Sequence, residues 1–203
     1  MTLPLMEPIK PDAKIATLAG PPRTYPSSEK ARLRKNRQVI NKGINNFFEW
    51  VKGAELVSLK ECNTKEDPVR PELDNEFRTS YGRKIYGVRY KNEIHAIMCF
   101  AFTNEIPKTV EELDNLSKDA FLQSALRDQK VGKIAIAYTV WSKKKGGGKL
   151  IVREVFKMIK KSNHLNRLVT LSPITEMATK FHLRNKAKLI SVNKETQNFE
   201  YLK

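Results

Sequence analysis

The spacing of apolar residues changes along the chain, and the two periods predict the order of helices and strands. Apolar positions three and four residues apart predict helices at about residues 29–53, 150–161 and 175–185, and a further helical stretch follows Pro107 as far as Arg127. Short β-branched, aromatic or continuous apolar runs predict strands at residues 55–59, 85–90, 94–102, 133–141, 167–171, 187–192 and 198–202. This order predicts an α/β fold with a mixed sheet flanked by helices.

Three local predictions are specific enough to be checked residue by residue. Lys91-Asn92-Glu93 separates two strand-like runs and indicates a hairpin. In the helix that follows Thr175, we expect Met177, Ala178 and Phe181 to face inward. The stretch from residue 63 to residue 80 is polar and contains two prolines, so we interpret it as a long loop.

The N-terminal residues show neither period. Residues 1–27 hold most of the prolines, which predicts an extended or disordered arm before a single domain at residues 28–203. The sequence shows no signal peptide and no apolar run long enough to cross a membrane, so we expect a cytoplasmic protein with no membrane insertion. In that compartment Cys62 and Cys99 would be reduced, although they could pair. No group of residues has the spacing of a metal site.

The composition is strongly basic. Lys and Arg number 38 against 22 Asp and Glu, which gives a formal net charge of +16. Such an excess favours polyanionic partners, including nucleic acid and phosphorylated ligands. The candidate contacts are the basic helix at residues 30–42 and a second basic face formed by Lys149, Arg153, Lys157, Lys160 and Lys161. The alternative is that both form solvated surfaces. Aromatic residues are not interleaved with them, so stacking on single-stranded nucleic acid is not indicated.

The turn between the strand at 133–141 and the next helix is the strongest candidate for a ligand-binding site. Its sequence is Lys143-Lys-Lys-Gly146-Gly147-Gly148-Lys149. Glycines allow close backbone approach to a ligand, and a helix start presents unpaired N–H groups to an anion such as a pyrophosphate. The turn is neither a P-loop, since Leu150 follows Lys149, nor a G-x-G-x-x-G dinucleotide motif. The alternative is a flexible, solvated turn.

Two motifs together resemble the GNAT (Gcn5-related N-acetyltransferase) family. That family has a [Gln/Arg]-x-x-Gly-x-[Gly/Ala] run between its fourth strand and the next helix, and Lys143-x-x-Gly146-x-Gly148 is similar, with Lys in place of Gln or Arg. The family then has an Ala-x-x-Phe-Tyr-x-x-x-Gly-Ala phrase, and the segment from Ala178 to Ala187 matches it with two departures. His182 stands for Tyr and Lys186 for the turn glycine, so we expect Asn185 to adopt the left-handed conformation instead.

The resemblance implies a GNAT-like fold, a mixed, centrally splayed β-sheet flanked by helices, that binds acetyl-CoA or another acyl-CoA. Backbone groups of Tyr138, Val140 and Trp141 would bind the pantetheine arm. The pyrophosphate would lie on the amides of Gly146, Gly147, Gly148 and Lys149, with Lys143 beside them. The thioester would lie where the two central parallel strands separate.

Two residues are candidates for catalysis. At the position of His182 the family often has a Tyr that protonates the departing thiolate, and a histidine can do the same. The alternative is a histidine that packs or caps within its helix. The run from Gly147 to Ile174 also resembles the GNAT-like domain of malonyl-CoA decarboxylases, in which the serine that matches Ser172 is implicated in catalysis. The alternative for Ser172 is a structural role ahead of Pro173.

The sequence leaves three functions open. The leading hypothesis is an acyl-CoA-dependent acyltransferase that acetylates an amine acceptor. The second is a non-catalytic GNAT-like protein that docks on a polyanion or an assembly through its basic surface. The third is an acyl-CoA decarboxylase of the malonyl-CoA type. Acyl-CoA binding separates the first and third from the second, and release of carbon dioxide separates the third from the first.

Overall fold

A computed structural model describes residues 27 to 202, so the predicted arm lies outside the described part except for Ser27. The helices are α1 (Ser27–Gly53), η1 (Thr64–Glu66), α2 (Asn75–Thr79), α3 (Val110–Arg127), α4 (Gly147–Lys161) and α5 (Glu176–Arg184). The strands are β1 (Glu55–Leu59), β2 (Lys84–Tyr90), β3 (Glu93–Thr103), β4 (Ile134–Ser142), β5 (Arg167–Thr170), β6 (Ser172–Pro173), β7 (Lys188–Val192) and β8 (Thr196–Tyr201).

The chain divides into two compact units, residues 1 to 47 and residues 48 to 203. In the first unit the described structure is the greater part of α1. Its residues 28 to 47 are exposed, including the apolar Ile40 and Ile44. The second unit holds the last turns of α1 and all the other elements. Among residues 27 to 202, no helix combines the length and the hydrophobicity that crossing a membrane would require.

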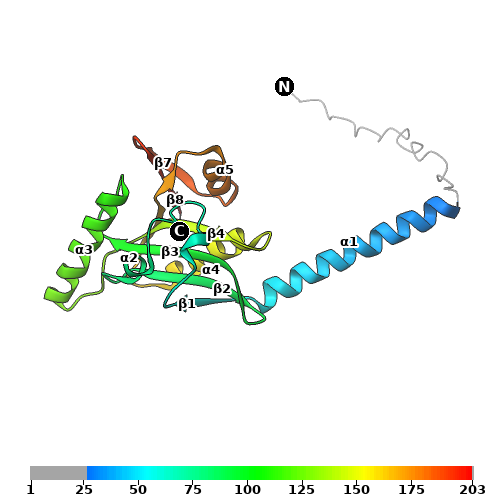
Figure 1. Ribbon diagram of the computed structural model, residues 1–203, viewed down its shortest axis with the longest axis horizontal. Helices are drawn as coiled ribbons and strands as arrows, with labels where there is room; N and C mark the ends of the chain where they lie inside the picture. The colour runs from blue at the N-terminus through cyan, green and yellow to red at the C-terminus, as the bar shows by residue number, and fades with distance from the viewer. Residues whose placement is uncertain (1–26, 203) are drawn as a thin grey trace, which may run out of the picture. The chain divides into compact units, whose positions relative to one another are not determined.

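The second unit is built on one eight-stranded sheet with the order β1-β2-β3-β4-β5-β8-β6, and β7 pairs with β8 (Figure 1). The only parallel pair of described strands is β4 with β5. Helix α4 covers one face with the fully buried Ile151, Val155 and Ile159. Helices α2 and α3 cover the other face through Phe77 and Leu113. Because both faces of the sheet are buried, the sequence of β4 is a continuous apolar run and does not alternate between apolar and polar residues.

The sheet opens at its centre. Residues 134 to 137 of β4 pair with residues 167 to 170 of β5, and the bond from Leu171 N to Ala137 O (2.9 Å) is the last backbone link between them. Beyond this point β6 turns to pair with β8, so the second half of β4 has no strand beside it on that side. A bulge in β4 adds to the divergence, because the pairing with β3 shifts between Cys99 and Phe100. The predicted centrally splayed α/β sheet is therefore confirmed.

The local predictions have mixed outcomes. The hairpin is confirmed, since Tyr90 pairs with Glu93 across Lys91 and Asn92, which both have positive φ (51° and 64°). The left-handed residue after α5 was assigned wrongly. Asn185 has φ −88° and ends the helix, whereas Lys186 itself has φ +67°. Asn185 is held instead by its side chain, whose Nδ2 donates to Phe181 O at 2.8 Å.

Two further predictions need correction. Met177 does not point into the core, because 74% of it is exposed. The segment 63–80 is not a plain loop, since it contains η1 and α2. It also buries a charged pair: Arg78 Nη2 lies 2.8 Å from Asp67 Oδ2, and both side chains are fully inaccessible. Thr139 of β4 donates a hydrogen bond to the same carboxylate (2.8 Å), which fastens the segment to the sheet.

Candidate functional site

An apolar cavity of about 270 Å³ lies where β4 and β5 separate. It is lined by the unpaired part of β4, by Gly148, by Ser172 and Pro173 of β6, by α5, and by Pro68 and Val69. It therefore brings together the glycine turn, the free strand edge and both candidate catalytic residues. A concave, mostly apolar pocket with a few convergent polar groups is the usual form of a small-molecule site.

The free edge of β4 forms one wall of this cavity. Tyr138, Val140 and Trp141, the predicted pantetheine contacts, all line it. The side chains of Tyr138 and Trp141 are buried in the core on the α2 and α3 side of the sheet, so only the backbone of these residues is offered to a ligand. The carbonyl of Tyr138 already accepts a hydrogen bond from Arg70 Nε (3.0 Å). The remaining edge can pair with an extended amide-containing ligand as a strand would.

The three positions of the turn take glycine for different structural reasons. Gly146 precedes α4 as its N-cap with φ +85°, a conformation that favours glycine, and no side chain caps the helix. Gly147 is buried, its N–H bonds Lys144 O, and an added Cβ would lie 3.0 Å from Ser142. An added Cβ on Gly148 would lie 3.0 Å from the ring of Phe181. An uncapped helix start with glycine on the cavity wall fits a pyrophosphate.

The lysines of the turn divide into two groups. Lys143 is paired with Glu66 (2.7 Å), and the ammonium of Lys144 lies over the rings of Trp50 and Tyr90. Within the described chain, Lys145 and Lys149 form no ion pair, and both are exposed. Of the lysines in the predicted phosphate site, Lys149 is thus available to an anion, while the charge of Lys143 is already balanced.

Ser172 and His182 are hydrogen-bonded at the floor of the cavity. His182 Nε2 lies 2.8 Å from Ser172 Oγ, and His182 Nδ1 lies 2.9 Å from the hydroxyl of Tyr201. The imidazole is 4% exposed and stacks on Phe199 at a centroid distance of 4.8 Å. Both ring nitrogens are engaged, so a proton exchanged between His182 and a molecule in the cavity would pass through Ser172 or Tyr201, which both line the cavity.

Burial sets the protonation state of this group. Desolvation lowers the pKa of His182 to about 4, so the ring is neutral near pH 7. A neutral imidazole donates through one nitrogen and accepts through the other. Two hydrogen-bond patterns therefore satisfy the row Ser172–His182–Tyr201: either Ser172 donates to the ring and Tyr201 accepts from it, or Tyr201 donates and Ser172 accepts. The row can pass a proton through Ser172 only if another proton enters the row as the first one leaves, because the ring then stays neutral.

Sequence reasoning missed the segment that closes the cavity from the other side. Arg70 lies at the point where the strands separate and donates to Tyr138 O on β4 and, through Nη2, to Leu171 O (3.2 Å) just before β6. Arginines are usually exposed, so a polar, proline-containing stretch gave no signal that one of them is buried between two strands. Asp67 and Arg78 were missed for the same reason.

Neither a protein-family model nor a curated protein matches the sequence. Solved structures do match the fold. An acetyltransferase from Bacillus subtilis in complex with CoA aligns with a TM-score of 0.50 and 10% identity, over 73% of this chain and 97% of that one. The GphF GNAT-like decarboxylase in complex with isobutyryl-CoA aligns with a TM-score of 0.53 and 10% identity, over 73% and 98%.

A malonyl-CoA decarboxylase from Cupriavidus metallidurans aligns over 70% of this chain with 21% identity and a TM-score of 0.42. This chain spans 36% of that enzyme's length. The similarity to the first two structures establishes the architecture: the chain has the GNAT fold, as the two sequence motifs implied.

Proposed function

We propose that this protein is an acyl-CoA-dependent acyltransferase with an amine as its acceptor. The observation that carries the proposal is the arrangement around one cavity. An uncapped, glycine-rich helix start, an unpaired strand edge and the hydrogen-bonded pair Ser172 and His182 all line it. The GNAT fold supports the same reading, because neighbours with this fold are described as complexes with CoA or isobutyryl-CoA.

In this proposal each part of the cavity has one task. The amides at the start of α4, with Lys149, bind the pyrophosphate, and the backbone of Val140 and Trp141 holds the pantetheine arm. The thioester then lies against Ser172 in an apolar space, where orientation of the reactants supplies much of the rate. Ser172 donates its proton to the departing thiolate and takes up the proton that the acceptor nitrogen loses, while the neutral ring of His182, held by Tyr201, orients its hydroxyl.

A second candidate function, decarboxylation of a malonyl-type acyl-CoA, is supported by the likeness to the GphF GNAT-like decarboxylase. The same pair of residues suits it, since Ser172 could protonate the carbon left after carbon dioxide departs. The apolar walls favour loss of charge from a bound carboxylate. The two candidates differ in their products and not in the residues that they use.

A binding screen followed by product analysis tests both candidates. Acetyl-, malonyl- and succinyl-CoA are added to the purified chain, and at least one of them is expected to raise its melting temperature. Release of free thiol with an amine present would then support acyl transfer, and release of carbon dioxide from malonyl-CoA would support decarboxylation. If none of the three thioesters shifts the melting temperature, both proposals fail and the non-catalytic alternative is supported instead.

A further inference from the structure

Arg70 is a buried cation that forms no ion pair in the part of the chain that the structure describes, although the charges of Glu72 and Asp67 are near enough to act on it. It is 8% exposed, and its hydrogen bonds go to two backbone carbonyls. No described carboxylate lies within ion-pair distance of it, and no described group bonds its Nη1. Buried charges in proteins are normally paired, because an isolated one is costly. The surroundings of Arg70 therefore favour an anionic ligand.

Arg70 lies on the wall of a second cavity, of about 360 Å³. This cavity shares Pro173 with the apolar cavity, so it lies beside Ser172. The start of α3 forms another part of the same wall, through Thr109, Val110 and Glu111. The second cavity thus begins at the point where β4 and β5 separate and ends at the N-terminus of an 18-residue helix.

The start of α3 offers hydrogen-bond donors to this cavity. Its N-cap, Thr109, accepts from Glu112 N through the side chain (3.0 Å) and from Leu113 N through the backbone (3.0 Å). Among the described residues, the N–H groups of Val110 and Glu111 have no partner. Free N–H groups at a helix start, with the positive end of the helix dipole behind them, attract an anion. Two independent features, this helix start and Arg70, therefore point to the same kind of ligand.

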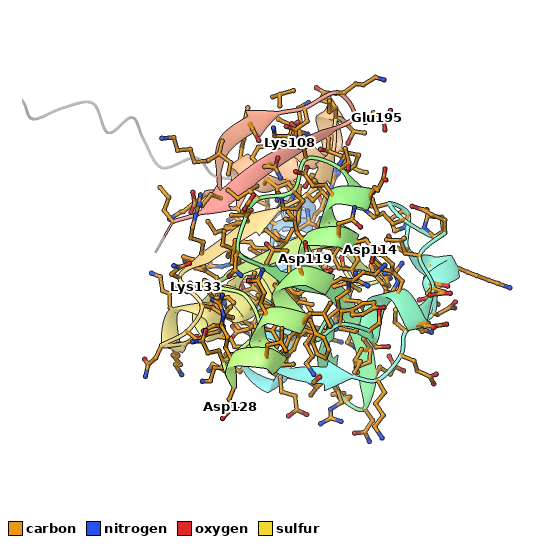
Figure 2. All side chains as sticks on the ribbon, turned by 90° about the vertical axis from the view of Figure 1, so that its left-hand side faces the viewer. Lys108, Asp114, Asp119, Asp128, Lys133 and Glu195 are labelled. Carbon is orange, nitrogen blue, oxygen red and sulfur yellow. The ribbon has the colours of Figure 1, made fainter. Side chains whose placement is uncertain are left out.

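Two carboxylates restrict what that ligand can be. Glu111 and Glu195 are exposed side chains on the rim of the same cavity. Figure 2 shows Glu195 and Lys108 at the same end of α3, and Thr196 bonds Lys108 O there. These glutamates repel a ligand with several negative charges, such as a phosphate ester. They suit a ligand that carries one carboxylate and one ammonium group.

We propose that this second cavity binds a free amino acid or a similar small amino-carboxylate. Its carboxylate lies between Arg70 and the N-terminus of α3, and its ammonium faces Glu111 and Glu195. A guanidinium suits such a carboxylate because its planar fork can donate two parallel hydrogen bonds.

The proposal that this ligand is the acyl acceptor rests on the acyltransferase function proposed above, whereas its binding does not. In that reaction the ammonium first releases one proton to solvent, and the free amine, which the glutamates no longer hold, turns toward the thioester beside Ser172. The amine nitrogen then bonds to the acyl carbon as the carbon–sulfur bond breaks. The second proton leaves the nitrogen, and the thiolate takes one proton, so that an amide and free CoA result.

The test is a calorimetric screen of the L-amino acids against their carboxamides, which lack the negative charge. At least one amino acid should bind, and its carboxamide should bind about tenfold more weakly or worse, since hydrogen bonds to charged groups are the strong ones. Arg70→Lys keeps the charge but loses the fork and should weaken binding to a similar extent. Equal binding of amino acids and carboxamides, or no binding of either, would overturn the proposal.

A second variant decides the question if Arg70→Lys does not fold. Val110→Pro removes one free N–H at the first position of α3, where proline is tolerated, and Thr109 has the extended backbone that proline requires before it. Val110→Ala is its control, because it shortens the side chain and keeps the N–H. The proline variant should bind the amino acid several-fold more weakly than the alanine variant, and equal affinity would refute the helix site.

Binding of acetyl-CoA is measured on the same samples. If acetyl-CoA binds and no amino acid does, only this inference fails. If an amino acid binds and no acyl-CoA does, the amino-carboxylate site stands and the acyltransferase proposal falls.

Discussion

Ser172 Oγ and His182 Nε2 lie 2.8 Å apart at the floor of an apolar cavity, although ten positions separate the two residues in the sequence. The contact exists because α5 begins three residues after β6 ends. His182, in the last turn of that helix, therefore lies close enough for its imidazole to contact Ser172 on the strand. A serine and a histidine at this distance can exchange a proton, and a buried pair of this kind is a recognised sign of a functional site.

The first prediction concerns this pair. His182→Phe keeps a ring that can stack on Phe199 but removes both hydrogen bonds. We expect turnover of acyl-CoA, measured as thiol release, to fall about 10²–10⁴-fold, which is the usual contribution of general acid–base catalysis. The affinity for CoA, measured by calorimetry, should change little. His182→Tyr should retain part of the activity. Wild-type turnover in His182→Phe would show that the residue is structural.

The second prediction concerns pH and stability. Unfolded histidine titrates near 6.5, whereas burial lowers the pKa of His182 to about 4 in the folded protein. Between these values only the unfolded chain binds the proton, so the free energy of unfolding should fall as pH drops from 6.5 to 4. The loss is about 3 kcal/mol, at about 1.4 kcal/mol per pH unit, and His182 contributes no pH dependence above 6.5.

Denaturant titrations of wild type and His182→Phe across this pH range measure the effect. Other groups titrate in both proteins, so the difference between them isolates His182. A difference that stays constant from pH 7 to pH 4 would contradict the prediction.

The third prediction concerns the glycine turn. Gly148→Val places a side chain against the ring of Phe181, and Gly146→Val must adopt φ +85°. Both changes should abolish acyl-CoA binding, seen as loss of the thermal shift, while the far-ultraviolet circular dichroism remains that of a folded protein. Gly43→Val is the matched control, because a Cβ there meets nothing within 4 Å apart from its chain neighbours and the backbone of its own helix. If Gly148→Val binds acyl-CoA like wild type, the pyrophosphate does not lie at this turn.

The fourth prediction concerns the buried charge pair. Arg78→Met leaves the carboxylate of Asp67 inaccessible to water and without its cation. Breaking such a pair costs about 3–5 kcal/mol of unfolding free energy. Arg89→Met removes the exposed partner of Glu55 and should cost about 1 kcal/mol or less. Denaturant unfolding of both variants provides the comparison, and similar losses would show that burial of the Asp67 pair is not what stabilises this segment.

Much of the fold could be predicted because its central elements have clear periods. The run at 133–141 corresponds to β4, and the stripe of Ile151, Val155 and Ile159 corresponds to the buried face of α4. The candidate site could be predicted in part. The motifs placed Gly148, Ser172 and His182 in separate elements, and the structure brings all three to one cavity.

The rest could not be predicted, because it depends on contacts that leave no periodic pattern. Nothing in the sequence near Arg70 distinguishes it from an exposed arginine, since its partners are backbone carbonyls on β4 and before β6. The same holds for Tyr201, which was expected only as part of a strand and is hydrogen-bonded to His182. Lys186 adopts a left-handed backbone that glycine or asparagine usually takes, so residue preference pointed to its neighbour.

The bond from Arg70 to Leu171 also has a consequence for folding kinetics. It joins residues 101 positions apart, whereas the β2–β3 hairpin closes across a two-residue turn. Contacts between distant residues form slowly, because the chain must lose loop entropy before they stabilise it. We therefore expect the hairpin to form early and the gap between β4 and β5 to take its final shape in a late step. Variants of Arg70 should then speed unfolding more than they slow folding.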